Sequence, residues 1–340
     1  MSYLPVPPTD PNMRLREAEA LGVADLTHPL KVRSRVLRRL LRRPVAVVAI
    51  AVIVFIYGAG IFAPLIAPHG FSDADFQDRY ASPSLSHPLG TDSLGRDLLS
   101  RAIWSAQTTV IISVAAVLTG GVFLGLTLGL IAGYARGAAD YIIMRMAEIF
   151  GSVPPILLLL IITATLLTDV QDLGSNVEDL TGQHWIVSSG APSYVLVFGA
   201  LAMFGWVGLA RLIRSQVLAL REAPYITAAQ AAGASDARII FWHLLPNVGN
   251  LLIVALTLSL GGAAGAEVGL TFLGIGVQPP HPSLGVMIFD ATGGNASTTV
   301  ANLRVHPLLI VVPGAVISSL ILAFNLLGDQ LTDVLSPRHR

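Results

Sequence analysis

Six long apolar runs constrain the fold of this chain more than any other feature of its sequence. Each run reaches or exceeds the roughly 17 residues at which a helix becomes long enough to cross the hydrocarbon core of a bilayer. A transmembrane β-barrel would instead show short segments of alternating hydrophobicity. The sequence therefore predicts an all-α polytopic membrane protein with six transmembrane helices. The predicted spans are Val45–Ile66, Val110–Ile131, Tyr141–Leu167, Tyr194–Ala210, Val248–Leu273 and Leu308–Leu327.

Composition agrees with a membrane protein and excludes several kinds of active site. Hydrophobic residues make up 53% of the chain and charged residues only 12%, about half of the roughly 25% found in an average soluble domain. Because there is no cysteine, disulfides, zinc–thiolate sites and thiol nucleophiles are excluded. The single lysine, Lys31, does not lie in a glycine-rich phosphate-binding loop, so the chain carries no P-loop ATPase of its own.

The distribution of basic residues predicts how the spans are oriented. Loops on the cytoplasmic side of a membrane protein carry an excess of arginine and lysine. One side of the predicted bundle holds the basic run before the first span and Arg136, Arg145, Arg211, Arg214, Arg221, Arg238, Arg338 and Arg340. The other side holds Arg79, Arg96, Arg101 and Arg304 among many acidic residues. We therefore expect both termini to be cytoplasmic, and an even number of spans is consistent with both lying on one side.

The spans divide the chain into three regions. Residues 1–43 are expected to form a cytoplasmic tail that ends in the basic amphipathic run Lys31–Arg43. We interpret that run as a positively charged anchor on the cytoplasmic side of the first span. It could also be a helix that binds lipid headgroups. Nucleic-acid binding fits poorly because the run lies directly beside the membrane. Residues 44–327 form the transmembrane domain, and residues 328–340 form a cytoplasmic tail.

An alanine-rich polar stretch, residues 211–246, separates the fourth span from the fifth. Pro224 suits the first turn of a helix, and Gly233 can adopt the left-handed conformation that ends one. Ser235 offers an N-cap for a second helix, Asp236–Leu245, which we expect to stop before Pro246. The stretch therefore predicts a bent two-helix arm on the cytoplasmic side, with an ordinary connecting loop as the alternative.

The order of residues within this arm resembles the coupling loop of ABC-transporter permease subunits. The family pattern is E-A-A, three residues, G, nine residues, I, one residue, L-P. The residues that the resemblance assigns to the coupling loop here are Thr227, Ala228, Ala229, Gly233, Ala234, Ser235 and Pro246. Two positions depart from the pattern, because Thr227 replaces a glutamate and His243 replaces an isoleucine. The departure at Thr227 puts in doubt a salt bridge from that position to an ATPase.

Two further segments resemble the C-type permease subunits of dipeptide, oligopeptide and nickel importers. They are His87–Arg101, HPLGTDSLGRDLLSR, and Gly269–Ile288, GLTFLGIGVQPPHPSLGVMI. The resemblance spans about residues 44–327. Its three ordered motifs are specific for the family but discriminate poorly among substrates.

The resemblance implies a type I importer permease in a bacterial inner membrane. It would form half of the translocation pathway with a second homologous permease subunit. Two ATPase domains, separate or fused, would carry ATP and Mg²⁺, and an external solute-binding protein would deliver peptides. Nickel chelates or glutathione are the alternative cargo. A secondary transporter without ATPase partners would leave residues 211–246 unexplained.

Charged residues and prolines near the spans give further candidates. Glu267 lies in the fifth span, where it either pairs structurally or lines a gate. Pro154 and Pro155 are expected to kink the third span, through packing or as part of a gate. Residues 94–102 read as an amphipathic helix leading into the second span. The polar side of this helix holds Arg96, Asp97 and Arg101. These residues either form the solvent-facing side of a simple amphipathic helix or contact the binding protein.

A membrane-embedded enzyme or a metal protein is the remaining rival. No H-E-x-x-H motif is present, and no glutamate–histidine cluster has the spacing of metal ligands. The histidines outside the membrane are scattered along the chain: His69, His87, His184, His281 and His306. We therefore expect no catalytic residues, no bound cofactor and no metal site.

Overall fold

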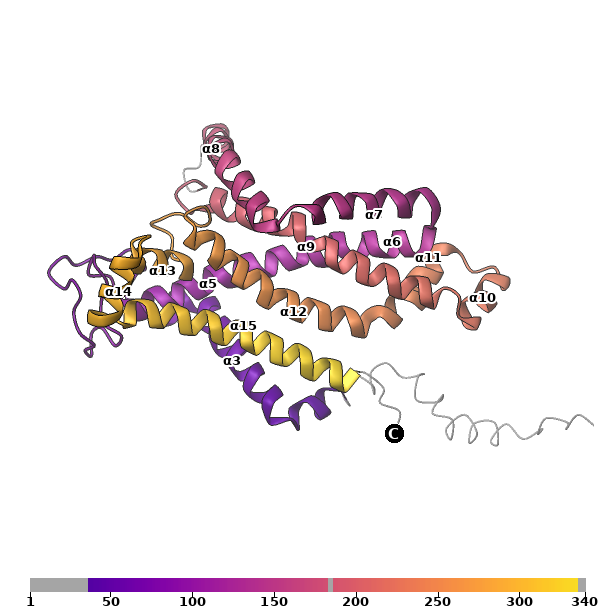
Figure 1. Ribbon diagram of the computed structural model, residues 1–340, viewed down its shortest axis with the longest axis horizontal. Helices are drawn as coiled ribbons and strands as arrows, with labels where there is room; N and C mark the ends of the chain where they lie inside the picture. The colour runs from indigo at the N-terminus through magenta and orange to yellow at the C-terminus, as the bar shows by residue number, and fades with distance from the viewer. Residues whose placement is uncertain (1–35, 183–185, 336–340) are drawn as a thin grey trace, which may run out of the picture.

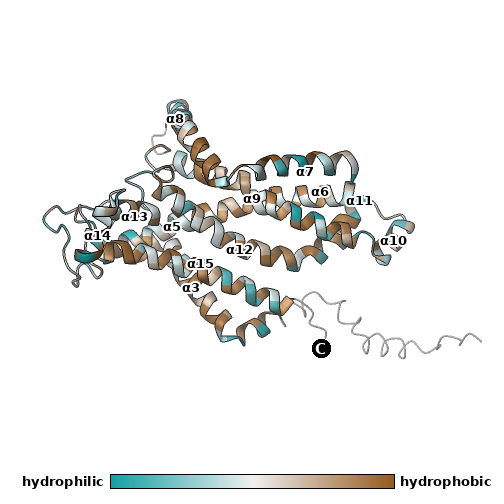
Figure 2. Cartoon of the chain, viewed as in Figure 1, coloured by the Kyte–Doolittle hydropathy of each residue, from teal (hydrophilic) through white to brown (hydrophobic). Residues whose placement is uncertain are grey.

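A bundle of long helices forms the body of the protein (Figure 1). The computed structural model describes residues 36–182 and 186–335. Within these ranges, six helices are long and apolar enough to cross a membrane: Pro44–Ile61, Leu98–Ala135, Pro155–Thr181, Ala191–Leu220, Asp236–Phe272 and Leu308–Leu335. The prediction of six spans is confirmed. Apolar residues follow the long helices, and polar residues gather toward the two ends of the bundle (Figure 2).

Four of the spans are single α-helices, and two are composite. The single helices are α3 (Pro44–Ile61), α8 (Pro155–Thr181), α9 (Ala191–Leu220) and α15 (Leu308–Leu335). The first composite span joins α5 (Leu98–Ala116), the π-helix η2 (Val117–Leu126) and α6 (Thr127–Ala135). The second joins α11 (Asp236–Arg238), the π-helix η3 (Ile239–Leu244) and α12 (Leu245–Phe272). Wide π turns are rare and often mark functional sites.

In the described part of the chain, the shorter helices outside the spans include α4 (Ala63–Ile66), α7 (Gly137–Ser152), α10 (Pro224–Ala231), α13 (Leu284–Thr292) and α14 (Ala296–Val305). Helices α13 and α14 lie at one end of the bundle, and α10 lies at the opposite end (Figure 1). The long polar segment between α4 and α5 shares the end of α13 and α14. We call this end the α13 end and the other the α10 end.

A row of glycines brings the composite α5–η2–α6 span close to α9. A Cβ atom added at Gly120 would lie 2.5 Å from the carbonyl oxygen of Ala202, and one at Gly129 would lie 2.8 Å from that of Ala210. Small residues allow helix backbones to approach in this way, which is how helices associate in lipid. The two spans form the rigid centre on which the remaining helices pack.

The first and last spans lie side by side (Figure 1). The first residue of span one and the last residue of span six lie at the same end of the molecule. The Arg43 guanidinium donates to the Gln330 amide oxygen and to the Asp333 carboxylate, each at 2.9 Å. Span six therefore continues to Leu335 rather than stopping at residue 327. Of the predicted N-terminal tail, residues 36–41 are helical, and residues 1–35 lie outside the described residues.

The second span begins twelve residues earlier than predicted. The Asp97 carboxylate accepts a hydrogen bond from the backbone N–H of Ser100 at 2.7 Å and so caps the helix. The expected amphipathic lead-in over residues 94–102 is therefore wrong at its start, because Leu94 precedes the helix. Spans four and five are longer as well, reaching into the polar stretch between them.

The predicted third span is broken rather than kinked. Helix α7 ends at Ser152, and Val153 is extended, with φ −102° and ψ 136°. A residue before proline is forced into this region by the proline ring, and Pro155 then starts α8 at its first turn. Helix α7 packs along α6, so only α8 crosses the bundle, and it extends to Thr181 into a segment expected to be polar loop.

Candidate functional site

The predicted cytoplasmic arm is one short helix followed directly by a span. Helix α10 ends in a Schellman motif, in which the N–H of Ala234 bonds the Ala229 carbonyl at 3.0 Å and the N–H of Gly233 bonds the Gln230 carbonyl at 2.9 Å. Gly233 has φ +81°, and a Cβ added there would meet nothing within 4 Å. Glycine is therefore required by the left-handed backbone and not by crowding.

The chain restarts immediately after this turn. The Ser235 hydroxyl caps the next helix by accepting from the N–H of Arg238. That helix does not stop before Pro246, as the sequence suggested, but runs through η3 into α12. Pro246 is tolerated because it lies in the first turn of α12, directly after the π-helix. The residues directly after the α10 turn therefore belong to a span 37 residues long.

Helix α10 is anchored on one face and exposed on the other. Ile226 is fully buried among Ile239, Leu244, Val217 and other apolar side chains of the α10 end. Thr227 and Ala228 are exposed on the opposite face, and Ala229 is half-buried. A small, smooth and firmly held surface of this kind suits contact with a protein partner.

Polar contacts tie the turn between α6 and α7 to the two ends of the α10 loop. The Arg136 guanidinium binds Glu222 at 2.7 Å, and the Tyr134 hydroxyl binds Asp236 at 2.6 Å. Nearby, Arg214 on α9 binds the Asp140 carboxylate through both of its oxygens at 2.5 and 2.6 Å. These hydrogen bonds hold the pKa of Asp140 below its ordinary value. The two ends of the α10 loop are therefore fastened to α6 and to the turn that follows it, and that region is itself held to α9.

A cavity of about 280 Å³ lies among the spans. It is lined by small and apolar residues of η2, α8, α9 and α12, together with the last residues of α5: Ala116, Val117, Gly121, Pro155, Leu159, Leu201, Phe204, Gly205, Ser259, Gly262, Ala263 and Ala266. Pro155, one of the two predicted pathway prolines, is among them, and Pro154 caps the same helix. The cavity is bordered by α12, the span that continues from the α10 loop.

The sequence of the chain matches two families over most of its length. Residues 125–340 match the binding-protein-dependent transport system inner membrane component, and residues 33–83 match the N-terminal transmembrane domain of oligopeptide transport permease C. The chain belongs to the binding-protein-dependent transport permeases. It is a multi-pass inner-membrane component of an ABC importer, and it is the permease rather than the ATPase.

Curated relatives align with nearly the whole permease. Oligopeptide transport system permease protein OppC of Mycobacterium tuberculosis (strain ATCC 25618 / H37Rv) is 32% identical over 309 residues, covering 91% of this chain and 95% of the relative. Glutathione transport system permease protein GsiD of Pectobacterium atrosepticum is 33% identical, covering 88% and 89%. Dipeptide transport system permease protein DppC of Bacillus subtilis (strain 168) is 32% identical, covering 89% and 85%.

Among solved structures, the inward-facing MetNI methionine ABC transporter covers 66% of the permease and 96% of its own chain at 19% identity. Its TM-score of 0.42 is too low to support a comparison of folds.

Glu267, the charged residue predicted in span five, is completely buried in the permease. Its carboxylate accepts hydrogen bonds from Thr109 of α5 at 3.0 Å, from Thr271 at 3.3 Å and from Ser283 at 2.7 Å. Ser283 also caps α13. The side chain is therefore directed into the contact between helices. The cavity is lined instead by its neighbour Ala266. A gating role for Glu267 remains a prediction.

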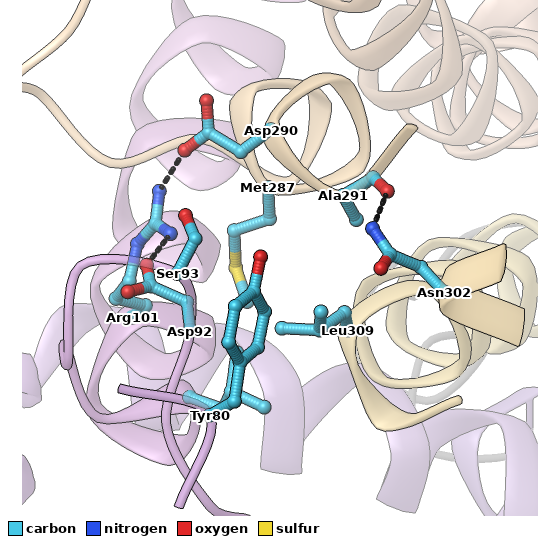
Figure 3. Close-up of a pocket in the computed structure, with 10 residues that line it drawn as sticks. Tyr80, Asp92, Ser93, Arg101, Met287, Asp290, Ala291, Asn302 and Leu309 are labelled. Carbon is cyan, nitrogen blue, oxygen red and sulfur yellow. Dashed lines mark hydrogen bonds and ion pairs between the residues drawn. The ribbon is translucent and has the colours of Figure 1, made fainter. Parts of the chain in front are cut away.

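At the α13 end of the permease, two arginines and two aspartates form a closed network, of which Figure 3 shows Arg101, Asp92 and Asp290. Arg101 binds Asp92 at 2.5 Å and Asp290 at 3.0 Å, and Arg96 binds the same two carboxylates at 2.7 and 2.9 Å. Asp290 lies on α13, so the network joins that helix to the segment before α5. Sequence reasoning selected Arg96 and Arg101 but missed Asp92 and Asp290, which are distant from each other along the chain.

Two of the histidines that look scattered along the sequence lie together in the permease. His69 and His87 have ring centres 5.0 Å apart, and both face Asp97. The interpretation of these histidines as scattered is therefore wrong for this pair. The cause is the segment between α4 and α5, which turns back on itself through backbone hydrogen bonds such as Thr91 N–H to the Ala81 carbonyl.

Proposed function

We propose that this permease imports peptides, either dipeptides or oligopeptides. The support for this cargo is the near-complete alignment with curated dipeptide and oligopeptide permeases. The observation that carries the transport mechanism is α10, a short and largely exposed helix that only the turn at Gly233 and Ser235 separates from a cavity-lining span. Such a helix is suited to receive a push from a soluble partner and to pass it to the pathway.

We further propose that α10 docks on a cytoplasmic ATPase domain. The exposed surface of Thr227 and Ala228 is small and largely uncharged, so a partner backbone can approach closely. Ile226 transmits the movement because it is clamped in the apolar cluster at the base of α12. Thr227 offers a hydroxyl rather than a carboxylate, so the contact with the ATPase is one of shape and not an ion pair.

The remaining partners follow from the family and from the geometry. A second homologous permease subunit would complete the pathway, and two ATPase domains would carry ATP and Mg²⁺. The α10 end, which also holds the start of span one and the end of span six, would face the cytoplasm. A solute-binding protein would then approach the α13 end.

The contact with the binding protein is proposed to include residues near Arg96, Asp97 and Arg101. The side chains of Asp97 and Arg101 are only 2% and 3% exposed and are engaged within the chain. Their part in such a contact would be to shape the surface. Leu94, which is 38% exposed, would provide the touching atoms.

The cargo is tested by reconstituting the permease with its partner subunits in liposomes. ATPase activity and uptake are measured with the binding protein supplied with a dipeptide, an oligopeptide, glutathione or a nickel chelate. We expect stimulation by peptide. Glutathione is the second candidate because a curated glutathione permease aligns at 33% identity. Stimulation by glutathione alone or by nickel chelate alone would replace peptide as the cargo.

A further inference from the structure

A group of three potential metal ligands lies at the α13 end of the bundle, outside the membrane spans except for the cap of α5. One ligand atom from each of His69, His87 and Asp97 can be chosen so that all three atoms lie within 4.8 Å of one another. The Nδ1 atom of His87 is 3.2 Å from one Asp97 oxygen, and the Nδ1 atom of His69 is 3.9 Å from the other. In the transport function proposed above, Asp97 only shapes the surface near the binding protein, and the two histidines have no part.

The Nδ1 atom of His69 is buried without a hydrogen-bond partner. It is the one such side-chain atom found in the described part of the chain. Leaving a polar atom unsatisfied away from water costs free energy, so an orphan of this kind calls for an explanation. The backbone of His69 itself is fully engaged, because its N–H bonds the Ser100 hydroxyl and its carbonyl accepts from Trp104. Its ring nitrogen Nδ1 is left without a partner among the described residues. The lone nitrogen is directed toward Asp97.

The spacing of the ligand atoms matches a small four-coordinate metal ion. Zinc lies about 2.1 Å from histidine nitrogen and carboxylate oxygen, which places tetrahedral ligands about 3.4 Å apart. The distances of 3.2 and 3.9 Å bracket this value. The rings of His69 and His87 lie close to each other, with centres 5.0 Å apart and planes inclined by 27°.

The surroundings supply the outer contacts that metal ligands commonly have. Histidine ligands usually present their second nitrogen to a carboxylate, and carboxylate ligands are themselves hydrogen-bonded. The Nε2 atom of His87 lies 3.8 Å from an oxygen of Asp78. Asp97 accepts from the N–H of Ser100 at 2.7 Å. Asp97 is therefore held in orientation by a hydrogen bond from beyond the cluster, and Asp78 lies near the outer nitrogen of His87 without bonding it.

We propose that His69, His87 and Asp97 bind one Zn²⁺ ion. Two imidazoles and one carboxylate are a known zinc ligand set, in which water takes the fourth position. The ion would satisfy the buried nitrogen of His69. It would also fasten the segment between α4 and α5 to the start of span two, beside the Arg96–Asp92 network. Its role is to hold structure at the α13 end, and no part of it depends on the cargo.

Metal binding by the full-length permease tests this site. The protein is purified through a tag without histidine, treated with EDTA, dialysed and titrated with Zn²⁺ by calorimetry. We expect one equivalent per chain, and Co²⁺ in its place should give the intense visible absorption of a tetrahedral site. His69→Gln and His87→Gln should each weaken Zn²⁺ binding at least tenfold. His306→Gln, a histidine stacked on Tyr80 at the same end, should bind as wild type does.

The variants are chosen so that loss of folding does not imitate loss of ligand. His69→Gln keeps the backbone bonds to Ser100 and Trp104, and size-exclusion elution checks that each variant remains folded. The wild-type stoichiometry and Co²⁺ spectrum do not depend on any variant. The proposal is overturned if wild type binds no Zn²⁺ after EDTA treatment. It is equally overturned if Co²⁺ shows only the weak spectrum of a six-coordinate ion, or if both glutamine variants bind with wild-type affinity.

Discussion

The hydroxyl of Ser283 donates a 2.7 Å hydrogen bond to the carboxylate of Glu267, and both side chains are completely buried. This bond joins the residue that caps α13 to the middle of the permease, because Glu267 lies on α12 and also accepts from Thr109 on α5. A charged group at this depth is costly unless its oxygens are satisfied. Here three hydroxyl groups satisfy it.

Removing one of these hydroxyls should therefore destabilise the fold. We expect Ser283→Ala to cost about 1.5–3 kcal/mol, the usual contribution of a hydrogen bond to a charged group. It should also lower the thermal midpoint in detergent. The matched control is Ser215→Ala, since the exposed Ser215 hydroxyl bonds only a carbonyl of its own helix. Equal midpoints for the two variants would contradict a structural role for the Ser283 bond.

Glu267 itself separates a structural role from a gating role. Glu267→Ala leaves the hydroxyls of Thr109 and Ser283 without their partner, so we expect a lower yield of the assembled complex. Glu267→Gln keeps an acceptor and should assemble. A change of import or basal ATPase rate in the assembled Gln variant would support a gate. Wild-type yield and import in both variants would remove Glu267 from the functional residues.

The network around Arg101 should contribute more to stability than any exposed ion pair. Arg101→Met leaves the buried Asp92 and the partly buried Asp290 without one of their two arginines. Removing one partner of a buried pair costs about 3–5 kcal/mol. Arg145→Met is the control, because its pair with Glu148 is exposed and such pairs contribute at most about 1 kcal/mol. Thermal unfolding of the two variants measures the difference, and a smaller loss for Arg101 would refute the prediction.

The pair between Arg214 and Asp140 predicts a pH dependence of stability. Hydrogen bonds from Arg214 depress the pKa of Asp140 in the folded protein. The stabilisation is therefore present above the unfolded pKa of about 3.9 and is lost as the pH falls through the lower folded value. Wild type should be more stable than Asp140→Asn at neutral pH. The difference in thermal midpoint should shrink below about pH 4, and a constant difference down to the lowest accessible pH would contradict it.

The orientation of the bundle is tested by labelling single cysteines, since the chain has none of its own. Cysteines at Ser93, Ser188 and Ser297 should react with an impermeant maleimide in intact cells. A cysteine at Ser235, beside α10 at the opposite end, should react only after the membrane is opened. Labelling of Ser235 from outside would reverse the proposed topology.

The number of spans follows from the sequence, but their limits do not. Hydropathy ends a span where polar residues begin, whereas Asp97 and Ser235 are caps that start helices inside polar segments. The third span shows the opposite failure. An unbroken apolar run suggests one helix across Pro154 and Pro155, and the backbone restriction on Val153 separates α7 from α8.

Some residues of the candidate sites could be predicted from the sequence, and others could not. Gly233 and Ser235 could be predicted because a helix end and a helix start are encoded locally. The Arg101 network and the His69–His87 pair could not, because each depends on how the segment between α4 and α5 folds back. That segment has no periodicity to read. Its path is set by turns and backbone hydrogen bonds such as that between Asp92 N–H and the Arg96 carbonyl.

Coupling through α10 is the central claim, and one pair of variants tests it most directly. Gly233→Val places a side chain where φ is +81°, a conformation that costs an L-residue about 1–2 kcal/mol or more. Gly249→Val is the matched control, because its Cβ also meets nothing within 4 Å but its φ is not positive.

The measurement is ATPase stimulation and import by the reconstituted transporter with its loaded binding protein. We expect Gly233→Val to insert, assemble and still capture the binding protein, while coupled import falls at least tenfold and Gly249→Val imports normally. Wild-type stimulation and import in Gly233→Val would contradict the account.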